Sequence, residues 1–178
     1  MEINTTDPQN EVFDVVNEKD EVVGEAIRGE VHRNPKLIHR AVHIWVLNDR
    51  GEILLQQRSL TKDKAPGQWD ISCAGHVKKG SNSEKTAQRE LKEELGISAD
   101  FRLIKKFIDR DIDQTEMVSL YYAVHNGPFK FPKEEIQQVR FFSKDKVLEF
   151  VRNDPDASLA SKEEIPIVFE FLEKNYSL

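Results

Sequence analysis

The chain has 178 residues, of which 38% are apolar and 33% charged, and its 26 Lys and Arg against 32 Asp and Glu give a formal net charge of −6. One domain with a sizeable core is therefore expected, and the acidic balance argues against a nucleic-acid polymer or an anionic membrane as partner. The single cysteine, Cys73, excludes an intramolecular disulfide, and no signal segment or bilayer-length apolar run is visible. A cytoplasmic location is therefore predicted.

Two hairpins are predicted in the first third of the chain. Apolar and β-branched residues at 12–16 and 22–27 flank one polar run, and those at 41–47 and 52–57 flank the turn sequence Asn48-Asp49-Arg50-Gly51. The proline-containing polar stretches between these strands are expected to be loops. The expected loops cover 29–37, 61–68 and 75–80, and a further strand is expected at 69–74.

The strongest helical pattern covers residues 82–95, where Ala87, Leu91 and Leu95 form one apolar stripe. Ser81 is the predicted N-cap, because a glutamate follows it at the S-x-x-E spacing of a capping box. A glycine directly after residue 95 is typical of a helix end. This segment is therefore predicted to be a helix that packs one face against the core.

Strands and helices alternate irregularly as far as the C-terminus. Together with the hairpins they predict an α/β fold, a mixed β-sheet sandwiched between α-helices, in a single domain over residues 1–178. The expected strands cover 101–108, 118–124 and 139–142, and the expected helices, both within 144–177, cover 144–151 and 163–175.

The predicted helix at 82–95 carries three glutamates, Glu90, Glu93 and Glu94, within about 100° of its circumference. Like charges at this spacing repel one another. A divalent cation would convert the repulsion into binding, because hard cations such as Mg²⁺ prefer carboxylate oxygens. A solvated acidic face is the alternative interpretation.

These glutamates belong to a longer motif that runs from Gly75 through Arg89-Glu90-Leu91-Lys92-Glu93-Glu94-Leu95-Gly96 to Ile97. Over residues 75–97 it resembles the Nudix box, G-x5-E-x7-R-E-U-x-E-E-x-G-U with U apolar, at eight of nine fixed positions. Ser81 stands at the ninth, where the family has a supporting glutamate. Weaker activity or an altered metal geometry is the expected consequence.

The resemblance implies the Nudix fold and a Mg²⁺ or Mn²⁺ ion held against a small-molecule diphosphate. Glu90, Glu93 and Glu94 would be the metal ligands and, with Arg89, the catalytic group. Arg89 would orient a glutamate rather than touch the substrate. The general base would be one of the box glutamates or a glutamate from a later loop, for which Glu135 is the candidate.

The flanking sequence has His32 and His39 seven residues apart, then Arg58 and Lys62, and His76 directly after the box glycine. This order resembles the type I isopentenyl-diphosphate isomerase branch of the Nudix proteins. The branch implies a second metal site made of His32, His39, His76 and Glu116, with Gln114 where the branch has a further glutamate. The candidate substrate-binding residues are Arg58, Lys62, Lys78 and Gly75.

The isomerase has its catalytic cysteine directly before the glycine-histidine pair, where this chain has Ala74. Cys73 lies one residue earlier, and a one-residue step along a strand turns a side chain to the opposite face. The chain is therefore interpreted as an isomerase-like Nudix hydrolase of a small organic or nucleoside diphosphate derivative. Isopentenyl-diphosphate isomerisation and a non-catalytic diphosphate-binding module remain the alternatives. The sequence leaves the substrate open and does not choose between a monomer and a homodimer.

Overall fold

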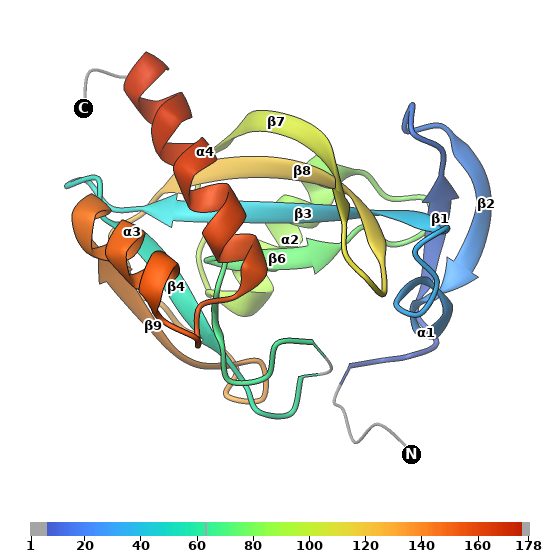
Figure 1. The fold of residues 1–178 in the computed structure, drawn as a ribbon, viewed down its shortest axis with the longest axis horizontal. Coiled ribbons are helices and arrows are strands. Elements are labelled where there is room, and N and C mark those ends of the chain that lie inside the picture. Colours follow the sequence, from blue (N-terminus) through green and yellow to red (C-terminus); the bar gives the residue numbers. More distant parts are fainter. Residues whose placement is uncertain (1–6, 63, 176–178) are drawn as a thin grey trace.

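The structure, a computed structural model, describes residues 7–62 and 64–175, and within them nine strands form one mixed sheet (Figure 1). Its central strand, β3 (Ile38–Leu47), pairs in parallel with β8 (Thr115–Val124) along its whole length, and β8 pairs with β7 (Phe101–Arg110). Three further strands share the other edge of β3 in turn: β1 (Val12–Val16), β6 (Cys73–His76) and β4 (Ile53–Arg58).

The first predicted hairpin is confirmed, because β1 pairs antiparallel with β2 (Val22–Ile27). The second prediction is only partly right. The turn after β3 forms, but β3 and β4 share a single residue pair, Leu47 with Ile53. Because β6 occupies the edge of β3 from Ala41 to Ile44, β4 diverges and pairs instead with β9 (Ile136–Phe142).

The strand predicted at 69–74 is two short strands with different partners. β5 (Trp69–Asp70) pairs with β4, whereas β6 pairs with β3 and extends to His76, into the predicted loop. Ser72 lies between β5 and β6. Its hydroxyl links β3 to β4, because it accepts a hydrogen bond from the Val46 N–H and donates one to the Leu54 carbonyl. The break therefore occurs where β3 and β4 separate, which the local apolar pattern does not reveal.

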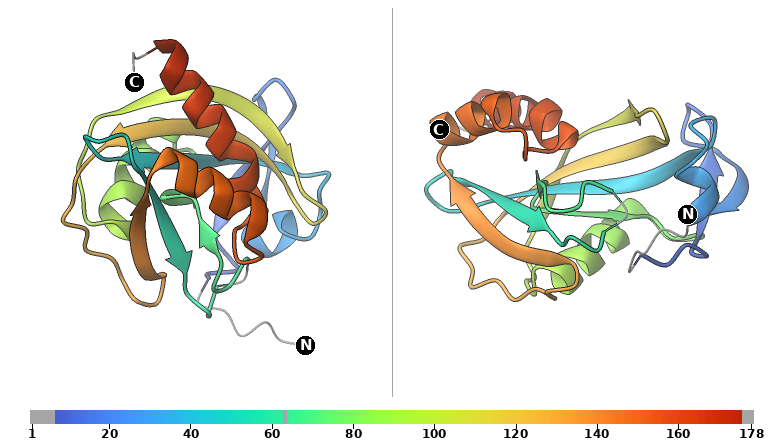
Figure 2. Two further views of the ribbon diagram at one scale, coloured as in Figure 1. Left: turned by 60° about the vertical axis from the view of Figure 1, so that its left-hand side comes forward. Right: turned by 60° about the horizontal axis from the view of Figure 1, so that its bottom comes forward.

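The helices lie on both faces of the sheet, which confirms the predicted α/β sandwich (Figure 2). α2 (Ser83–Glu94) covers one face, and α3 (Lys144–Asn153) and α4 (Leu159–Asn175) cover the other. None of the helices in the described part of the chain is both long enough and apolar enough to span a membrane.

Alternate residues of β3 serve the two faces, as the two-residue period of a strand requires. Ile44 packs in the apolar cluster that contains Leu91 of α2, and Trp45 packs in the one that contains Val168 of α4. Towards the start of β3, the α4 side of the strand also carries the polar residues His43 and His39. The fold therefore places a polar surface beside its two cores.

Several element boundaries differ from the predictions. α2 begins at Ser83 with Asn82 as N-cap, because the Asn82 side chain, and not that of Ser81, accepts the hydrogen bond from the Lys85 N–H at 2.9 Å. Gly96 follows the helix with φ of 69°, as predicted for a glycine at a helix end. A short helix, α1 (Arg28–Val31), interrupts the loop predicted at 29–37, and the last helix begins at Leu159 rather than 163. Residues 176 and 177 of the predicted helical region lie outside the described residues.

Candidate active site

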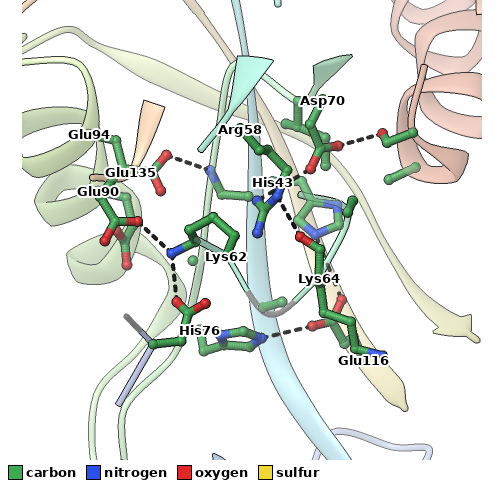
Figure 3. Close-up of a pocket in the computed structure, with 18 of the residues that line it drawn as sticks. His43, Arg58, Lys62, Lys64, Asp70, His76, Glu90, Glu94, Glu116 and Glu135 are labelled. Carbon is green, nitrogen blue, oxygen red and sulfur yellow. Dashed lines mark hydrogen bonds and ion pairs between the residues drawn. The ribbon is translucent and has the colours of Figure 1, made fainter. Parts of the chain in front are cut away.

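A cleft of about 750 Å³ opens beside the sheet and gathers most of the predicted site residues (Figure 3). Its volume is that of a small-molecule site. Strands β3, β4, β6 and β8, helix α2 and the segment before β1 all contribute to its lining. The predicted residues that line it are Arg58, Lys62, Gly75, His32, His76, Arg89, Glu90, Glu93, Glu94, Glu116 and Glu135.

Glu90 and Glu94 reach the cleft from α2 by packing against β6. Glu94 accepts hydrogen bonds from the Ala74 N–H at 3.3 Å and from Gln56 at 3.4 Å. Glu90 lies directly over Gly75, where a Cβ atom would come within 2.0 Å of its Oε1. The box glycine is therefore required for a close approach between strand and carboxylate, rather than for an unusual backbone angle.

Arg89 binds two of the box glutamates, as the resemblance implies. Its guanidinium lies 2.6 Å from Oε1 of Glu90 and 2.8 Å from Oε2 of Glu93, and it also donates to the His76 carbonyl. Glu93 is largely exposed, whereas Glu90 is buried. The three glutamates thus differ in their surroundings, and only Glu90 and Glu94 are desolvated carboxylates.

The pKa values of Glu90 and Glu94 are raised above the ordinary 4.5. Burial is the main cause for both, and the mutual repulsion of Glu90 and Glu94 adds to the increase for Glu90. Arg89 opposes the shift of Glu90, and Arg58 opposes that of Glu94. A bound cation would relieve exactly this repulsion, so the pair has the electrostatics of a cation site.

The metal-free protein is expected to lose stability as pH rises from about 6.5 to about 9. Folded Glu90 and Glu94 retain protons that the unfolded chain has already released, so a rising pH favours unfolding. His43, whose pKa is raised to about 9, acts in the same direction. Melting temperatures measured across this range with chelator should fall by about 2–4 °C per kcal/mol lost.

The matching control is the same series with Mg²⁺ or Mn²⁺. A cation that binds the ionised carboxylates displaces their protons, so its affinity should rise with pH and the decline in melting temperature should shrink. A metal-free melting temperature that stays level between pH 6.5 and 9 in wild type and in Glu90→Gln alike would contradict the assigned shifts.

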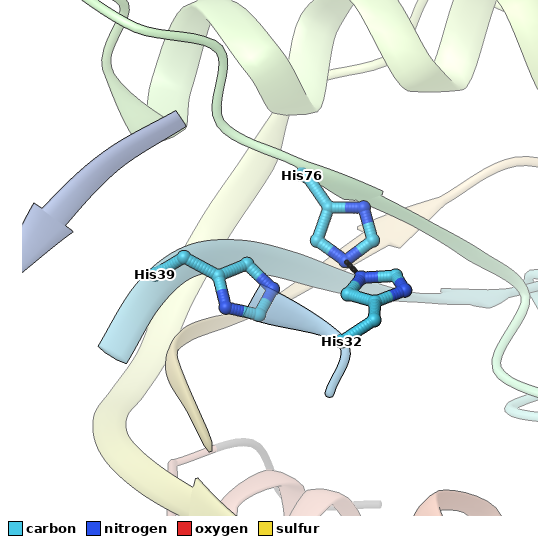
Figure 4. A group of neighbouring side chains, drawn as sticks. All are labelled: His32, His39 and His76. Carbon is cyan, nitrogen blue, oxygen red and sulfur yellow. Dashed lines mark hydrogen bonds between the residues drawn. The ribbon is translucent and has the colours of Figure 1, made fainter. Parts of the chain in front are cut away.

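The second predicted set, His32, His39, His76 and Glu116, also comes together, and Figure 4 shows its three histidines. The three imidazoles each offer a nitrogen within 4.8 Å of the others. Oε1 of Glu116 lies 3.0 Å from Nε2 of His76 and 3.4 Å from Nε2 of His39. Both ring nitrogens of His39, a fully buried residue, have no hydrogen-bond partner within the described residues, and Nε2 is the one that faces Glu116. A buried imidazole nitrogen without a hydrogen-bond partner is free to coordinate a metal ion, so these residues fit one.

Electrostatics at this cluster also suit a metal ion. Burial lowers the pKa of His76 to about 3, which its hydrogen bond to Glu116 does not overcome. Burial alone would raise the pKa of Glu116, but the hydrogen bond from His76 and the nearby His39 imidazole hold it well below its usual range. A neutral imidazole beside an ionised carboxylate is the ligand state that a transition metal binds.

Two predicted cations line the cleft and one does not. Arg58 donates to the Lys64 carbonyl and lies 3.4 Å from Asp70. Nζ of Lys62 is 2.6 Å from Asp7 and 2.5 Å from Glu135, and these two carboxylates raise the pKa of Lys62 although burial opposes them. Lys78 is exposed, pairs with Glu11 and is absent from the lining of the cleft.

Sequence analysis missed several polar residues of the cleft. Period-two alternation along β3 places His43 on the same face as His39, and this signal was available. For the others no local signal exists, because their roles depend on contacts made across the fold. The missed residues that line the cleft include Asp7, Arg28, His43, Asp70, Asp109 and Gln68.

Cys73 and Ala74 point as predicted. Cys73 is fully buried in the apolar cluster beneath α2, and Ala74 lines the cleft. Burial and the nearby Glu94 charge raise the pKa of Cys73 well above its usual value, so the group stays a thiol. The position of the isomerase cysteine is thus occupied by a methyl group.

A mixed sheet between helices, with a glutamate-bearing strand, loop and helix at a cleft, defines a Nudix-type fold. The family model of the NUDIX domain matches residues 37–162. The chain belongs to the Nudix family, which confirms the sequence prediction, and enzymes of this family generally use divalent metal ions.

Relatives come from both predicted branches. The chain is 36% identical to Nudix hydrolase 3 of Arabidopsis thaliana over 162 residues, covering 82% of this chain but only 21% of the plant protein. It is 31% identical to an uncharacterized Nudix hydrolase of Listeria monocytogenes, covering 89% of this chain and 90% of the relative. Isopentenyl-diphosphate Delta-isomerase 2 of Photorhabdus laumondii is 29% identical, with 83% and 85% covered.

Solved structures show the same fold at low sequence identity. DR0079 from Deinococcus radiodurans superposes with a TM-score of 0.77 at 23% identity, covering 88% of this chain and 98% of that one. An Ap4A hydrolase of C. elegans superposes with a TM-score of 0.58 at 17% identity, covering 76% and 98%. These likenesses establish the fold and leave the substrate open.

Proposed function

We propose that this chain is a divalent-metal-dependent hydrolase of a diphosphate linkage in a small organic or nucleoside diphosphate derivative. The observation that supports it most is the pair of desolvated, mutually repelling carboxylates, Glu90 and Glu94, in a cleft that also contains Arg58 and Lys62. Carboxylates for a cation beside cations for an anion form a site for a metal-bound phosphate.

The residues divide into three roles in this proposal. Glu90 and Glu94 hold Mg²⁺ or Mn²⁺ with help from Glu93, and Arg89 fixes the orientation of Glu90. A bound divalent cation supplies charge neutralisation of the phosphates and lowers the pKa of a coordinated water. Arg58 binds phosphate oxygens as a planar fork and Lys62 binds them as a point charge.

The general base has two candidates that the cleft supports. Glu135 lines the cleft from the loop before β9, and its carboxylate lies 2.5 Å from Nζ of Lys62. Glu93 is the most exposed of the box glutamates. A carboxylate that accepts the proton of the attacking water must be ionised, and the raised pKa of the desolvated Glu90 disfavours that residue for the role.

The test is a panel of diphosphates assayed with Mg²⁺, with Mn²⁺ and with chelator, following release of phosphate or of the leaving group. Metal-dependent turnover of at least one compound, lost with chelator, is the expected result. A chain that binds diphosphates saturably and turns over none of them would instead be the non-catalytic binding module.

Isopentenyl-diphosphate isomerisation is the second candidate, and the assembled histidine cluster with Glu116 is the observation in its favour. Its weakness is the cysteine position, since Ala74 lines the cleft and Cys73 does not. Proton exchange into isopentenyl diphosphate in deuterated water measures this activity. Exchange that disappears in Cys73→Ala would support it, and an absence of exchange in wild type would dismiss it.

We also propose that His32, His39, His76 and Glu116 bind a second metal ion. Isothermal titration with Mn²⁺ or Zn²⁺ is expected to resolve two binding events in wild type. His39→Asn should remove one of them and leave the other, because the box carboxylates are unchanged. Two undisturbed binding events in His39→Asn would rule out this ligand set.

A further inference from the structure

A buried carboxylate on α4 has no part in the function described so far. Glu164 is 2% exposed, and both of its oxygens are hydrogen-bonded. Oε1 lies 2.5 Å from Nδ1 of His43, and Oε2 accepts from the Trp45 indole N–H at 2.9 Å. His43 and Trp45 are two residues apart on β3, so one carboxylate bridges α4 to one face of the central strand.

The arrangement fixes the His43 ring with one nitrogen directed towards the cleft. Nδ1 is engaged by Glu164, and Nε2 lies 3.8 Å from Oε2 of Glu116, which is beyond hydrogen-bond distance. His43 lines the cleft, whereas Trp45 is fully buried in the core. A carboxylate that holds the far nitrogen of an imidazole sets the orientation and tautomer of the near one.

His43 also lines the same cleft as Arg58 and Lys62, the predicted phosphate-binding residues. In Figure 3 the labelled glutamates of α2 lie on one side and His43 lies on the other, with Lys62 between them. Glu164 lies 2.5 Å from Nδ1 and Glu116 lies 3.8 Å from Nε2, so a carboxylate faces each ring nitrogen. Nε2 is therefore the ring nitrogen that a ligand can reach, in the same cleft as the predicted phosphate-binding residues Arg58 and Lys62.

We propose that His43 contacts the substrate, donating a hydrogen bond from Nε2 to an anionic oxygen of the bound diphosphate, and that Glu164 is the residue that positions it. This inference rests on the proposed function and deepens it. It adds a third donor to Arg58 and Lys62, supplied from β3 rather than from β4 and the loop that follows it. The ligand must therefore have a charged phosphate oxygen that can reach His43 on β3.

A purely structural ion pair between α4 and β3 is the competing explanation, and Trp45 provides the matched control. Trp45→Phe removes one hydrogen bond from the same Glu164 carboxylate, on the side away from the cleft. It should lower the melting temperature while leaving ligand affinity within about threefold of wild type. Glu164→Gln perturbs the same carboxylate on the side that holds His43.

Affinity for inorganic pyrophosphate in the presence of Mg²⁺, measured by calorimetry, is the readout, with kcat and KM for any substrate from the panel. His43→Leu and Glu164→Gln should weaken pyrophosphate binding about 10- to 100-fold, the range of a hydrogen bond to a charged group. His43→Gln should restore part of the affinity, because its amide nitrogen can donate from a similar position. If His43 and Glu164 formed only a structural ion pair, His43→Gln would restore none of the pyrophosphate affinity.

The outcomes separate the two proposals. If wild type binds and hydrolyses but the His43 and Glu164 variants bind pyrophosphate as wild type does, the inference fails and the hydrolase remains. If wild type neither binds pyrophosphate nor hydrolyses any diphosphate, both fail. Weakened binding in Trp45→Phe equal to that in Glu164→Gln would also overturn the inference, because a general loss of packing would explain both.

Discussion

Glu94→Gln is expected to reduce the metal-dependent turnover of a diphosphate about 10³-fold while leaving the fold intact. A divalent cation supplies several kcal/mol of charge stabilisation, and each 1.36 kcal/mol corresponds to a tenfold change in rate. The amide has the shape of the carboxylate and can still accept from the Ala74 N–H and from Gln56. It also removes one of two repelling charges, so the metal-free melting temperature should hold or rise.

The matched control is Glu84→Gln, an exposed glutamate in the first turn of the same helix. It changes the net charge equally and should leave kcat and KM near the wild-type values. Steady-state kinetics with Mg²⁺ and metal titration of both variants give the comparison. Turnover by Glu94→Gln within threefold of wild type would remove Glu94 from the metal ligands.

Gly75→Ala is expected to lower turnover about 100-fold through a single added methyl group. Its Cβ would lie 2.0 Å from Oε1 and 2.2 Å from Cδ of Glu90, so the carboxylate has to move away. A displacement of this size at a catalytic group typically costs about two orders of magnitude. The glutamate side chain is flexible, and the backbone of Gly75 has no positive φ, so the fold should be retained.

Gly24→Ala is the control for Gly75→Ala, since a Cβ atom at residue 24 would meet nothing within 4 Å. Melting temperature and metal affinity should both match wild type in Gly24→Ala. In Gly75→Ala only the metal affinity and the turnover should fall. Unchanged metal affinity in Gly75→Ala would mean that Glu90 takes no part in cation binding.

Local sequence patterns predicted most elements of this fold but not which strands pair. The apolar stripe of Ala87, Leu91 and Leu95 located α2, and the apolar and β-branched stretches on either side of a polar run located β1 and β2. The second hairpin failed because β6 competes with β4 for one edge of β3, and no pattern within either strand expresses that competition. The same limit explains the missed break at Ser72, whose hydroxyl bridges strands that are distant in sequence.

The site residues also divide into those that the sequence could predict and those that it could not. The box glutamates, Arg89 and Gly75 lie in one short stretch whose spacing is set by a helix and the strand before it, so sequence could predict that they lie together. His43 and Glu164 are 121 residues apart, and neither has a neighbour in sequence that indicates the other. Ser81 illustrates a local ambiguity, since it and Asn82 are both good N-caps and only the geometry selects Asn82.

The surroundings of Lys62 have a consequence for which anions the cleft can admit. Its ammonium group is already held by two internal anions, Asp7 and Glu135. In the proposed function an incoming ligand that binds Lys62 would compete with these carboxylates, which are tethered at high local concentration. A singly charged metabolite gains nothing from the exchange, whereas a group with two negative charges does. If Lys62 binds the substrate as proposed, the cleft would therefore favour ligands of high charge density.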